Sequence, residues 1–340
     1  MSTDAVGGVW TYAADLRAEL AEAGVEVVLA TLGPSPPPDG GLWLDCRLEW
    51  QEDPWEDVRA SGEWLREQAD AVRADVVHLN GYAHAALPWR VPVVVTAHSC
   101  VLSWHEAVRG TPAGPAWERY REAVTAGLRG ADSIVAPTVA MRRALRRHYG
   151  CDRCCRVISN GVSPQLAPAA AREPFVLGAG RLWDEAKGLD TLDAAARGLP
   201  WPIEVAGDAG GRRAPRVRLL GELDRDDLRA RMARAEIFAH PARYEPFGLA
   251  VLEAALAGCA LVLGDIESLR EQWEDAAVFV APGDSAQLRS TLQWLIADGE
   301  VRRATARVSQ RRARLRHRRA MAGEYLKLYT QLVAPRAVPA

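Results

Sequence analysis

The sequence predicts an α/β protein of two domains, each built on a parallel, doubly wound β-sheet. Short apolar segments, such as Asp75–Leu79 and Val91–Ala97, alternate along the chain with amphipathic segments of helical period. Strands that alternate with helices form parallel sheets with helices on both faces, because each helix must bury its apolar side. The length of 340 residues exceeds what one core usually organises, so we expect two such domains.

The composition is that of an ordinary globular protein, with 49% hydrophobic and 25% charged residues. The net charge of −2 argues against a general nucleic-acid binder. Residues 1–20 lack the basic start and apolar core of a signal peptide. The longest apolar run, Leu249–Gly264, contains Glu253 and is too short to cross a bilayer. We therefore expect a cytoplasmic protein with no nucleic-acid partner.

The six cysteines are expected to be reduced thiols. Cys151, Cys154 and Cys155 have the spacing of half a zinc site, but no second pair of ligands follows at a suitable distance in the sequence. Reduced thiols agree with a reducing cytoplasm.

The first half opens with a glycine pair, Gly7-Gly8, ahead of an amphipathic helix. A glycine pair before a helix can admit a phosphate or another ligand, although it also marks plain turns. The expected elements of this half are a helix over 11–23, a strand over 25–29, a helix over 55–73, strands over 75–79, 91–97 and 133–137, a basic helix over 141–149, and a strand-like segment over 157–162. Pro164, Pro168 and Pro174 then interrupt regular structure, and we place the linker there.

Polar residues follow two of these strands directly. Asn80 and His84 come after the strand over 75–79, and His98 comes after the strand over 91–97. Ligands of open α/β sheets bind at the carboxyl ends of the strands, so all three are candidates for substrate contact. A hydrogen-bonded loop residue is the alternative for each. Trp104 offers a rigid apolar plate on which the ring face of a ligand can stack, with plain packing as the alternative.

The second half repeats the alternation of strands and helices. The expected elements are a strand over 175–179, a helix opening at 187–190, strands over 203–206 and 217–221, a helix after 224–227, a strand over 237–239, a helix over 249–257, strands over 260–263 and 277–280, a helix over 285–297, and a last helix over 321–332.

The stretch from His240 to Gln272 organises this half. Glu245 stands in a proline-flanked turn, Phe247-Gly248-Leu249 leads into a helix, and Glu253 falls in its second turn. The first turns of a helix leave backbone N–H groups unpaired, and Gly248 lets an anion approach them. Glu253 is too far into the helix to cap it. A carboxylate at this position, next to a helix start that can bind a phosphate, suits the hydroxyls of a ribose.

Two cations stand where a strand gives way to a helix. Arg181 follows the strand over 175–179, and Lys187 precedes the next helix. A lysine at a helix start is unfavourable by itself, so its presence indicates an anion nearby. Together the two side chains would stabilise a diphosphate leaving group as its negative charge grows.

Two charged segments have simpler alternatives. Asp224 and Asp226 have the spacing of a metal-binding Asp-x-Asp pair, but capping of the helix that follows explains them better. Residues 302–319 contain nine arginines and no acid. A solvated helix surface is the expected interpretation, and contact with an anionic lipid or anionic acceptor is the second one.

The pair Glu245-x7-Glu253 with its PFGL, and the GRL…KG segment of Arg181 and Lys187, resemble the donor site of the retaining family 4 glycosyltransferases (glycosyl transferases group 1). That resemblance implies the GT-B fold, with two Rossmann-like domains facing each other across a cleft. It implies that Arg181 and Lys187 hold the donor diphosphate, although Lys187 lies one residue further from Arg181 than the commonest spacing. It further implies that Glu245 and His98 contact the transferred sugar.

The resemblance also assigns further residues. Gly207 and Asp208 correspond to the glycine-rich segment near the nucleotide, and Leu220 lies in the strand that seats the base. Gly7 and Gly8 face the donor diphosphate or the acceptor. In the family a strand precedes this glycine loop, but only six residues precede Gly7 here, so we expect that strand to be missing.

The resemblance predicts an N-terminal acceptor-side domain over 1–163 and a donor domain over 164–320, with the last helix, within 321–340, packing back on the first domain. The predicted activity is that of a hexosyltransferase that moves a sugar from a nucleotide-diphosphate sugar to a glycan, lipid or small-molecule acceptor, with retention, no cofactor and no metal. The alternative is a truncated, non-catalytic nucleotide-sugar-binding or interaction protein, which the missing strand would favour. The arginine-rich helices leave peripheral contact with the inner face of the membrane open, and the oligomeric state also stays open.

Overall fold

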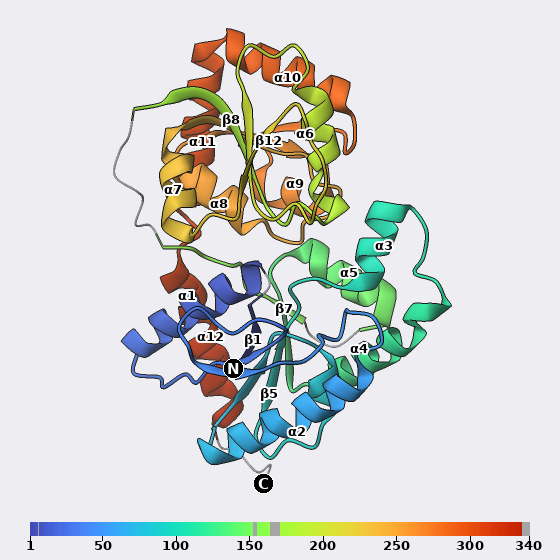
Figure 1. Ribbon diagram of the computed structural model, residues 1–340. Coiled ribbons are helices and arrows are strands. Elements are labelled where there is room, and N and C mark those ends of the chain that lie inside the picture. The colour runs from blue at the N-terminus through green and yellow to red at the C-terminus, as the bar shows by residue number, and fades with distance from the viewer. Residues whose placement is uncertain (6, 152–154, 164–170, 335–340) are drawn as a thin grey trace. The chain divides into compact units, whose positions relative to one another are not determined.

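The computed structural model describes residues 1–5, 7–151, 155–163 and 171–334, which form two compact units (Figure 1). Unit 1 contains Met1–Gly161 and the C-terminal segment from Arg318 onward, and unit 2 contains Val162–His317. The boundaries therefore lie two or three residues before those expected at 163 and 320. Of the prolines expected to interrupt the chain, Pro164 and Pro168 lie outside the described residues, whereas Pro174 lies within a strand.

Unit 1 begins with a strand, which corrects the expectation that the first strand is missing. Strand β1 (Ser2–Asp4) pairs in parallel with β2 (Ala30–Leu32), and β2 pairs with β3 (Leu42–Leu44). The strand expected over 25–29 is thus displaced to Ala30–Leu32. The position of β2 is set by the short strand β1, because the register pairs Ser2 with Ala30. The apolar run alone does not contain that information.

A second parallel sheet of unit 1 has the order β4-β5-β6-β7. Its strands are Val77–Leu79, Val93–Thr96, Ser133–Ala136 and Cys155–Val157. The helices of this unit are α1 (Gly8–Glu22), α2 (Trp55–Ala71), α3 (Val101–Arg109), α4 (Glu118–Gly130) and α5 (Val139–Tyr149), with single 3₁₀ turns at Ala83–Ala86 (η1) and Pro115–Trp117 (η2). The sheet and its helices share one apolar core.

The last helix, α12 (Arg318–Val333), belongs to unit 1 and packs against α1 (Figure 1). Arg318 at its start forms ion pairs with Glu19 at 2.6 Å and Asp15 at 3.6 Å. Further along, Tyr329 hydrogen-bonds the ring of His78 at 2.5 Å. His78 is therefore a core residue, as its place inside the strand predicts.

Unit 2 is a six-stranded parallel sheet in the order β10-β9-β8-β11-β12-β13. The strands are β8 (Glu173–Ala179), β9 (Ile203–Ala206), β10 (Arg218–Gly221), β11 (Ala235–His240), β12 (Ala260–Gly264) and β13 (Val278–Val280). The helices are η3 (Glu185–Lys187), α6 (Leu189–Ala195), α7 (Arg225–Arg234), α8 (Leu249–Leu256), α9 (Glu267–Trp273), α10 (Ser285–Ala297) and α11 (Gly299–Ala313).

The six-stranded sheet has an apolar core on each face. Along β8, Leu177 faces the core formed with α8 and α9, whereas its neighbour Val176 faces the core formed with α6 and α10. Along β11, Phe238 faces the core formed with α8 and α9, and Ile237 faces the core formed with α6 and α10. Successive side chains of a strand point to opposite faces, so strands that are apolar throughout are buried on both sides. This arrangement confirms the predicted doubly wound sheet.

Two charged segments have structural roles. Asp224 caps α7, since its carboxylate accepts a hydrogen bond from the amide of Asp227 at 2.8 Å. The arginine run is not one helix surface, because α11 ends at Ala313 and α12 begins at Arg318. Buried Arg302 binds Glu236 at 3.2 Å and a backbone carbonyl of α10. The expectation of a wholly solvated surface is therefore wrong for part of the run.

Candidate functional site

The order of strands in unit 2 marks a place for a ligand. The chain starts at β8, adds β9 and β10 on one side, and then crosses to add β11 on the other side. At such a switch point the loops after two adjacent strands diverge and leave a crevice at their carboxyl ends. The loops that follow β8 and β11 carry Lys187 and Glu245, respectively.

Lys187 is held in place by its own turn. Asp184 caps the 3₁₀ turn η3 by accepting a hydrogen bond from the Ala186 amide at 3.0 Å. The Lys187 side chain is 9% exposed, and its Nζ lies 2.9 Å from Oε2 of Glu245 and 3.5 Å from the carbonyl oxygen of Tyr244. An ammonium group has three protons to donate. Within the described residues only these two contacts engage it, so one proton remains for a ligand.

Glu245 receives two contacts on a single oxygen. His240, the last residue of β11, lies with its Nε2 3.1 Å from Oε2, the same oxygen that Lys187 contacts. Burial by itself would raise the pKa of Glu245, but the charge of Lys187 and the hydrogen bond with His240 outweigh burial, and the net pKa lies below its ordinary value. Glu245 is therefore ionised, and no described residue hydrogen-bonds its Oε1. The contribution of His240 is not anticipated by the sequence analysis, although its place at a strand end is the same signal that identifies His98.

The loop between β11 and α8 is fixed from both sides. The amide of Arg243 donates to the Ala186 carbonyl at 2.8 Å, which joins this loop to η3. From α9, Ser268 donates to the Glu245 carbonyl at 2.5 Å and Gln272 donates to the Phe247 carbonyl at 2.8 Å. These backbone contacts hold Glu245 in place without using its carboxylate. Neither Ser268 nor Gln272 stands out in the sequence.

Helix α8 starts at the same place. Gly248 precedes it with φ at +89°, a backbone conformation that favours glycine. Phe247 is buried in the core, and Leu249 packs against that core from the first turn of the helix. The unpaired amides at the start of α8 therefore lie on the same loop as Glu245, as the sequence predicts.

Arg181 is the more accessible cation of this region. Its side chain is 36% exposed, its guanidinium lies 5.4 Å from the centre of the Trp183 ring, and its only described ion pair is a 3.8 Å contact with Asp184. Such a contact is weak at this exposure. Arg181 is thus free to turn toward an anion, whereas Lys187 is already oriented.

The loops after β8 and β9 approach each other closely. A side chain on Gly207 would place its Cβ 1.8 Å from the Gly180 carbonyl oxygen, so only glycine fits. The Asp208 carbonyl accepts a hydrogen bond from the Trp183 amide at 3.1 Å, and the Asp208 carboxylate accepts one from the Gly210 amide at 2.8 Å. Leu220 lies at the end of the adjacent strand β10 and is half-buried. The structure therefore brings Gly207 and Asp208 together with the loop of Arg181.

Glu253 has partners that the sequence analysis does not anticipate. Its side chain is 10% exposed, and its Oε1 accepts hydrogen bonds from Arg225 at 3.3 Å and Arg229 at 3.2 Å. Both arginines belong to α7. No described residue bonds Oε2, so one carboxylate oxygen is satisfied within the protein and the other remains for a ligand.

In unit 1 the structure joins His98 to Asn80. The Nε2 atom of His98 lies 2.8 Å from Oδ1 of Asn80, and the edge of Tyr12 packs against the ring with centroids 4.6 Å apart. Burial lowers the pKa of His98 to about 3, so the ring is neutral at neutral pH. His98 and Asn80 thus form a hydrogen-bonded pair at the ends of β4 and β5. No sequence motif marks Tyr12 as a neighbour of His98.

His84 is engaged by helix α2 of its own unit. Its ring is buried, and its Nε2 lies 3.0 Å from the Ser61 hydroxyl and 3.1 Å from the Val58 carbonyl, both of α2. Burial lowers the pKa of His84 to about 4. Helix α2 covers this turn, which the position after β4 cannot reveal, and the contact of His84 with an acceptor stays a prediction.

The roles predicted for Gly7, Gly8 and Trp104 stay predictions. Gly7 and Gly8 are exposed at the start of α1, with Gly7 at φ +81°. Trp104 is half-buried on α3, with the guanidinium of Arg109 5.4 Å from its ring centre.

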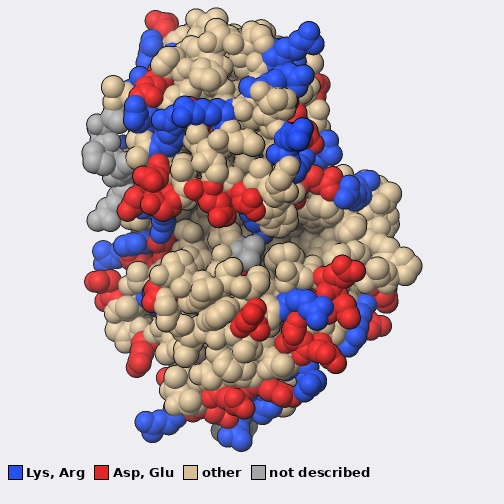
Figure 2. Space-filling model, viewed as in Figure 1, with Lys and Arg blue, Asp and Glu red and all other residues tan. Residues whose placement is uncertain are grey.

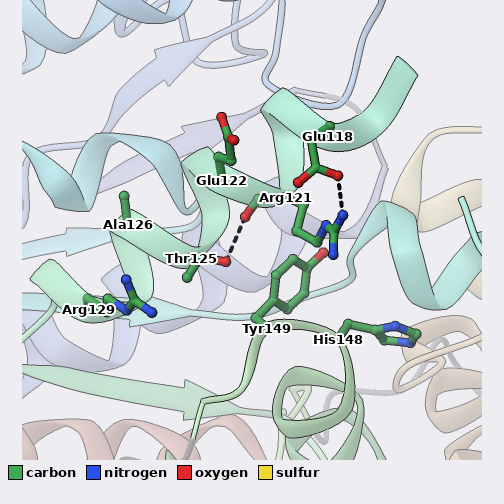
Figure 3. Close-up of a pocket in the computed structure, with 8 residues that line it drawn as sticks. All are labelled: Glu118, Arg121, Glu122, Thr125, Ala126, Arg129, His148 and Tyr149. Atoms are coloured by element: carbon green, nitrogen blue, oxygen red, sulfur yellow. Dashed lines mark hydrogen bonds and ion pairs between the residues drawn. The ribbon is translucent and has the colours of Figure 1, made fainter. Parts of the chain in front are cut away.

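A surface hollow of about 430 Å³ lies between α4 and α5 of unit 1 (Figure 3). Within its lining Glu118 pairs with Arg121, and the Thr125 hydroxyl donates to the Arg121 carbonyl. None of the predicted site residues lines this hollow.

Among the residues that the structure describes, no three His, Cys, Asp or Glu side chains gather as metal ligands, and no helix is long and apolar enough to cross a membrane. Cys155 is a free thiol, while Cys154 lies outside the described part of the chain. Acidic and basic side chains are interspersed over the face that Figure 2 shows, in keeping with the net charge of −2.

The fold and these strand-end loops define the chain as a GT-B-type α/β protein with two Rossmann-like units. Two family models match it: Glycosyltransferase Family 4 over residues 6–166 and Glycosyl transferases group 1 over residues 168–312. The two matches together take in most of the chain, which therefore belongs to glycosyltransferase family 4.

Individual proteins show the same relationship. Glycogen synthase of Mycobacterium tuberculosis is 32% identical over 273 residues, which cover 71% of this chain and 64% of that protein. The chain thus spans slightly less than two thirds of this curated relative. Sucrose-phosphate synthase of Thermosynechococcus elongatus has the same fold, with a TM-score of 0.83 at 22% identity over 98% of both chains. The Anabaena protein HepE, solved in complex with UDP-glucose, has a TM-score of 0.76 at 19% identity and covers 97% of this chain and 99% of that one.

Proposed function

We propose that this protein transfers a hexose from a nucleotide-diphosphate sugar to an acceptor hydroxyl, with retention of the anomeric configuration and without a metal. The observation that carries the proposal is the buried Lys187–Glu245 pair at the switch point of the six-stranded sheet. Among the described residues, each partner keeps a polar group without a contact, a proton on Lys187 and an oxygen on Glu245, and we propose that a ligand binds both.

The unused proton of Lys187 and the exposed guanidinium of Arg181 suit the two phosphates of the donor. When the bond between the anomeric carbon and the diphosphate oxygen breaks, the bonding electron pair stays on that oxygen. Cations already in place stabilise this charge without reorganisation, which lowers the barrier. Because two side chains supply the positive charge, we propose that no metal is required.

The unengaged Oε1 of Glu245 suits hydroxyl groups of the sugar. In the same way, Oε2 of Glu253 suits the hydroxyls of the ribose, while Arg225 and Arg229 keep that carboxylate ionised and oriented. Asp208 and Gly207 lie beside the diphosphate loop, and Leu220 lies on the strand proposed to seat the base. In unit 1 we propose that His98 contacts the transferred sugar and that Gly7, Gly8 and Trp104 contact the acceptor.

Retention requires that the acceptor attack on the face from which the diphosphate leaves, or that a covalent intermediate form. Lys187 and His240 both contact Oε2 of Glu245, and its Oε1 is the oxygen proposed to bind sugar hydroxyls, so neither oxygen is left to bond the anomeric carbon. We therefore propose front-face attack, in which the acceptor hydroxyl bonds the anomeric carbon and passes its proton to the departing phosphate oxygen. The acceptor class remains open among a glycan, a lipid and a small molecule.

The competing proposal is a non-catalytic nucleotide-sugar binder. Its main support was a missing first strand, and β1 occupies that place. A panel of nucleotide sugars, assayed for release of the nucleoside diphosphate with and without candidate acceptors, separates the two. Turnover with one donor supports the enzyme, whereas thermal stabilisation by a donor without any release of diphosphate supports the binder.

We also propose that the exposed arginines of α11 bind anionic lipid headgroups. Arg303, Arg307 and Arg311 recur every four residues along one side of the helix, and none forms an ion pair with a described residue. Leu315, just beyond the helix, is 78% exposed. Sedimentation with vesicles of anionic and of neutral lipid tests this contact. Equal binding to both, or wild-type binding by Arg307→Glu/Arg311→Glu, would contradict it.

A further inference from the structure

The side chain of Asn80 bonds both strand β1 and the ring of His98. The side-chain amide of Asn80 donates from Nδ2 to the Ser2 carbonyl at 2.7 Å, and the Asn80 backbone amide donates to the Ser2 hydroxyl at 3.1 Å. A carbonyl oxygen can only accept, so the atom of Asn80 that faces Ser2 must be the NH₂ group. Strand β1 thereby fixes the orientation of the amide.

With that orientation, Oδ1 of Asn80 faces His98 at 2.8 Å from Nε2. Oδ1 can only accept as well, so Nε2 must carry a proton. Because burial keeps the ring neutral at neutral pH, it has one N–H in all, and Nδ1 has a free lone pair. No described residue hydrogen-bonds Nδ1, and the His98 side chain remains partly exposed.

We infer that Asn80 is a positioning residue that holds His98 as the Nε2–H tautomer, so that Nδ1 accepts a hydrogen bond from a hydroxyl group of the substrate. Tyr12 supports the same geometry, since its edge-on packing limits rotation of the ring. The identity of the ligand as a sugar rests on the proposed function. The tautomer does not, because Ser2, Asn80 and His98 define it in the free protein.

This tautomer makes the site selective for ligand groups that donate a hydrogen bond. An Nδ1 lone pair binds a group that donates, such as a hydroxyl, and disfavours one that can only accept, such as an ether oxygen. A site built to accept from a hydroxyl discriminates strongly against an analogue that lacks it, because a buried acceptor is then left unpaired. Deoxy and O-methyl analogues of the donor sugar should therefore lose turnover at one ring position, by about 10-fold or more.

Long-range ¹H–¹⁵N correlation spectra of protein labelled at histidine test the tautomer directly at neutral pH. His98→Gln assigns the His98 signals. We expect one protonated nitrogen, Nε2, and an unprotonated Nδ1 in the wild type, and a shift toward a mixture of the two tautomers in Asn80→Ala. A proton on Nδ1 or on both nitrogens in the wild type would overturn the inference, whether or not any enzymatic activity has been found.

A double-mutant cycle separates positioning of His98 from a general structural role. Asn80→Ala should lower kcat/KM by about 10-fold, the contribution of one hydrogen bond. In a His98→Ala background the same change should cost less than about 2-fold, because Asn80 acts through His98. Equal losses in both backgrounds would contradict the inference.

If Asn80→Ala does not fold, Asn80→Ser serves instead, since its side chain is too short to reach the ring. Ser61→Ala is the matched control. It removes a partner of the buried His84 ring but leaves the Val58 carbonyl to bind the same Nε2. We expect wild-type kinetics and an unchanged His98 tautomer.

Discussion

Nζ of Lys187 lies 2.9 Å from Oε2 of Glu245, and both side chains are largely buried. Each charge is therefore compensated by the other before any ligand arrives. The pair stays in place because separate backbone contacts fix the two loops that carry it. This arrangement keeps a cation and an anion side by side where a donor would present a diphosphate and a sugar.

The first prediction concerns Lys187. Lys187→Ala should lower kcat by about 10²-fold, because leaving-group charge goes unanswered. It should also lower the free energy of unfolding by about 1–3 kcal/mol, because Glu245 loses its main counter-charge in a buried position. Steady-state kinetics and urea denaturation measure the two effects. Lys327→Ala, which removes an exposed pair with Glu324, is the control and should change neither.

A change at Arg181 should separate the effect on turnover from the effect on the free energy of unfolding. Its side chain is more exposed and its ion pair is long, so Arg181→Ala should change the free energy of unfolding by less than about 0.5 kcal/mol. Turnover should nevertheless fall by about 10²-fold. Kinetics and denaturation of the same preparation decide this. A loss of stability without a loss of turnover would assign Arg181 a structural role. Arg303→Ala on α11 is the matched control.

Glu245 and Glu253 should differ kinetically. Glu245→Gln removes charge next to the proposed site of the reacting sugar and should mainly lower kcat, by about 10²-fold or more. Glu253→Gln weakens the proposed contact with the ribose, which does not change during the reaction, so it should mainly raise the donor KM. Near-wild-type constants for both variants would mean that the two glutamates only stabilise the helix region. Arg229→Ala tests the structural part of the Glu253 contact, because it leaves the carboxylate in place.

The stability of the protein should depend on the protonation of His98. Its pKa is lowered to about 3 in the folded protein and is about 6.5 when unfolded. Between these values the unfolded chain binds the proton and the folded one does not, so stability falls as the pH drops from 6.5 toward 3. His98→Gln should reduce this slope by up to about 1.4 kcal/mol per pH unit. Chemical denaturation at several pH values measures it, and an unchanged slope would contradict a ring that stays neutral in the folded protein.

Removal of metal should not change the activity. The proposed leaving-group stabilisation relies on Arg181 and Lys187, and Asp224 is used as a helix cap. Activity should therefore survive excess EDTA. Loss of activity that Mn²⁺ or Mg²⁺ restores would revive the Asp224–Asp226 interpretation.

The fold could be predicted from the sequence because apolar strands and amphipathic helices alternate regularly. The prediction from sequence is wrong where the position of an element or side chain depends on a partner that is distant in the sequence. Strand β2 starts at Ala30 because β1 pairs with it there, and the apolar run from Val25 does not reveal this register. The arginine run divides between two units, because Arg302 binds Glu236 and Arg318 binds Glu19, both distant in sequence.

The candidate site follows the same pattern. Motif spacing identifies Arg181, Lys187, Glu245 and Glu253, because a loop after a strand is a local feature. The residues that orient them come from other elements and have no local signature. His240 binds Glu245, Arg229 binds Glu253, and the Ser2 carbonyl orients Asn80 against His98.

Binding of nucleoside diphosphates tests the central claim most directly, since it requires neither the sugar nor the acceptor. Isothermal titration with UDP, ADP and GDP should find one that binds the wild type. Its affinity should fall at least about 10-fold in Arg181→Ala and in Lys187→Ala. His98→Gln should bind it as the wild type does, because a nucleoside diphosphate carries no sugar to transfer. No binding by any of the three, or wild-type affinity in both cation variants, would contradict the account.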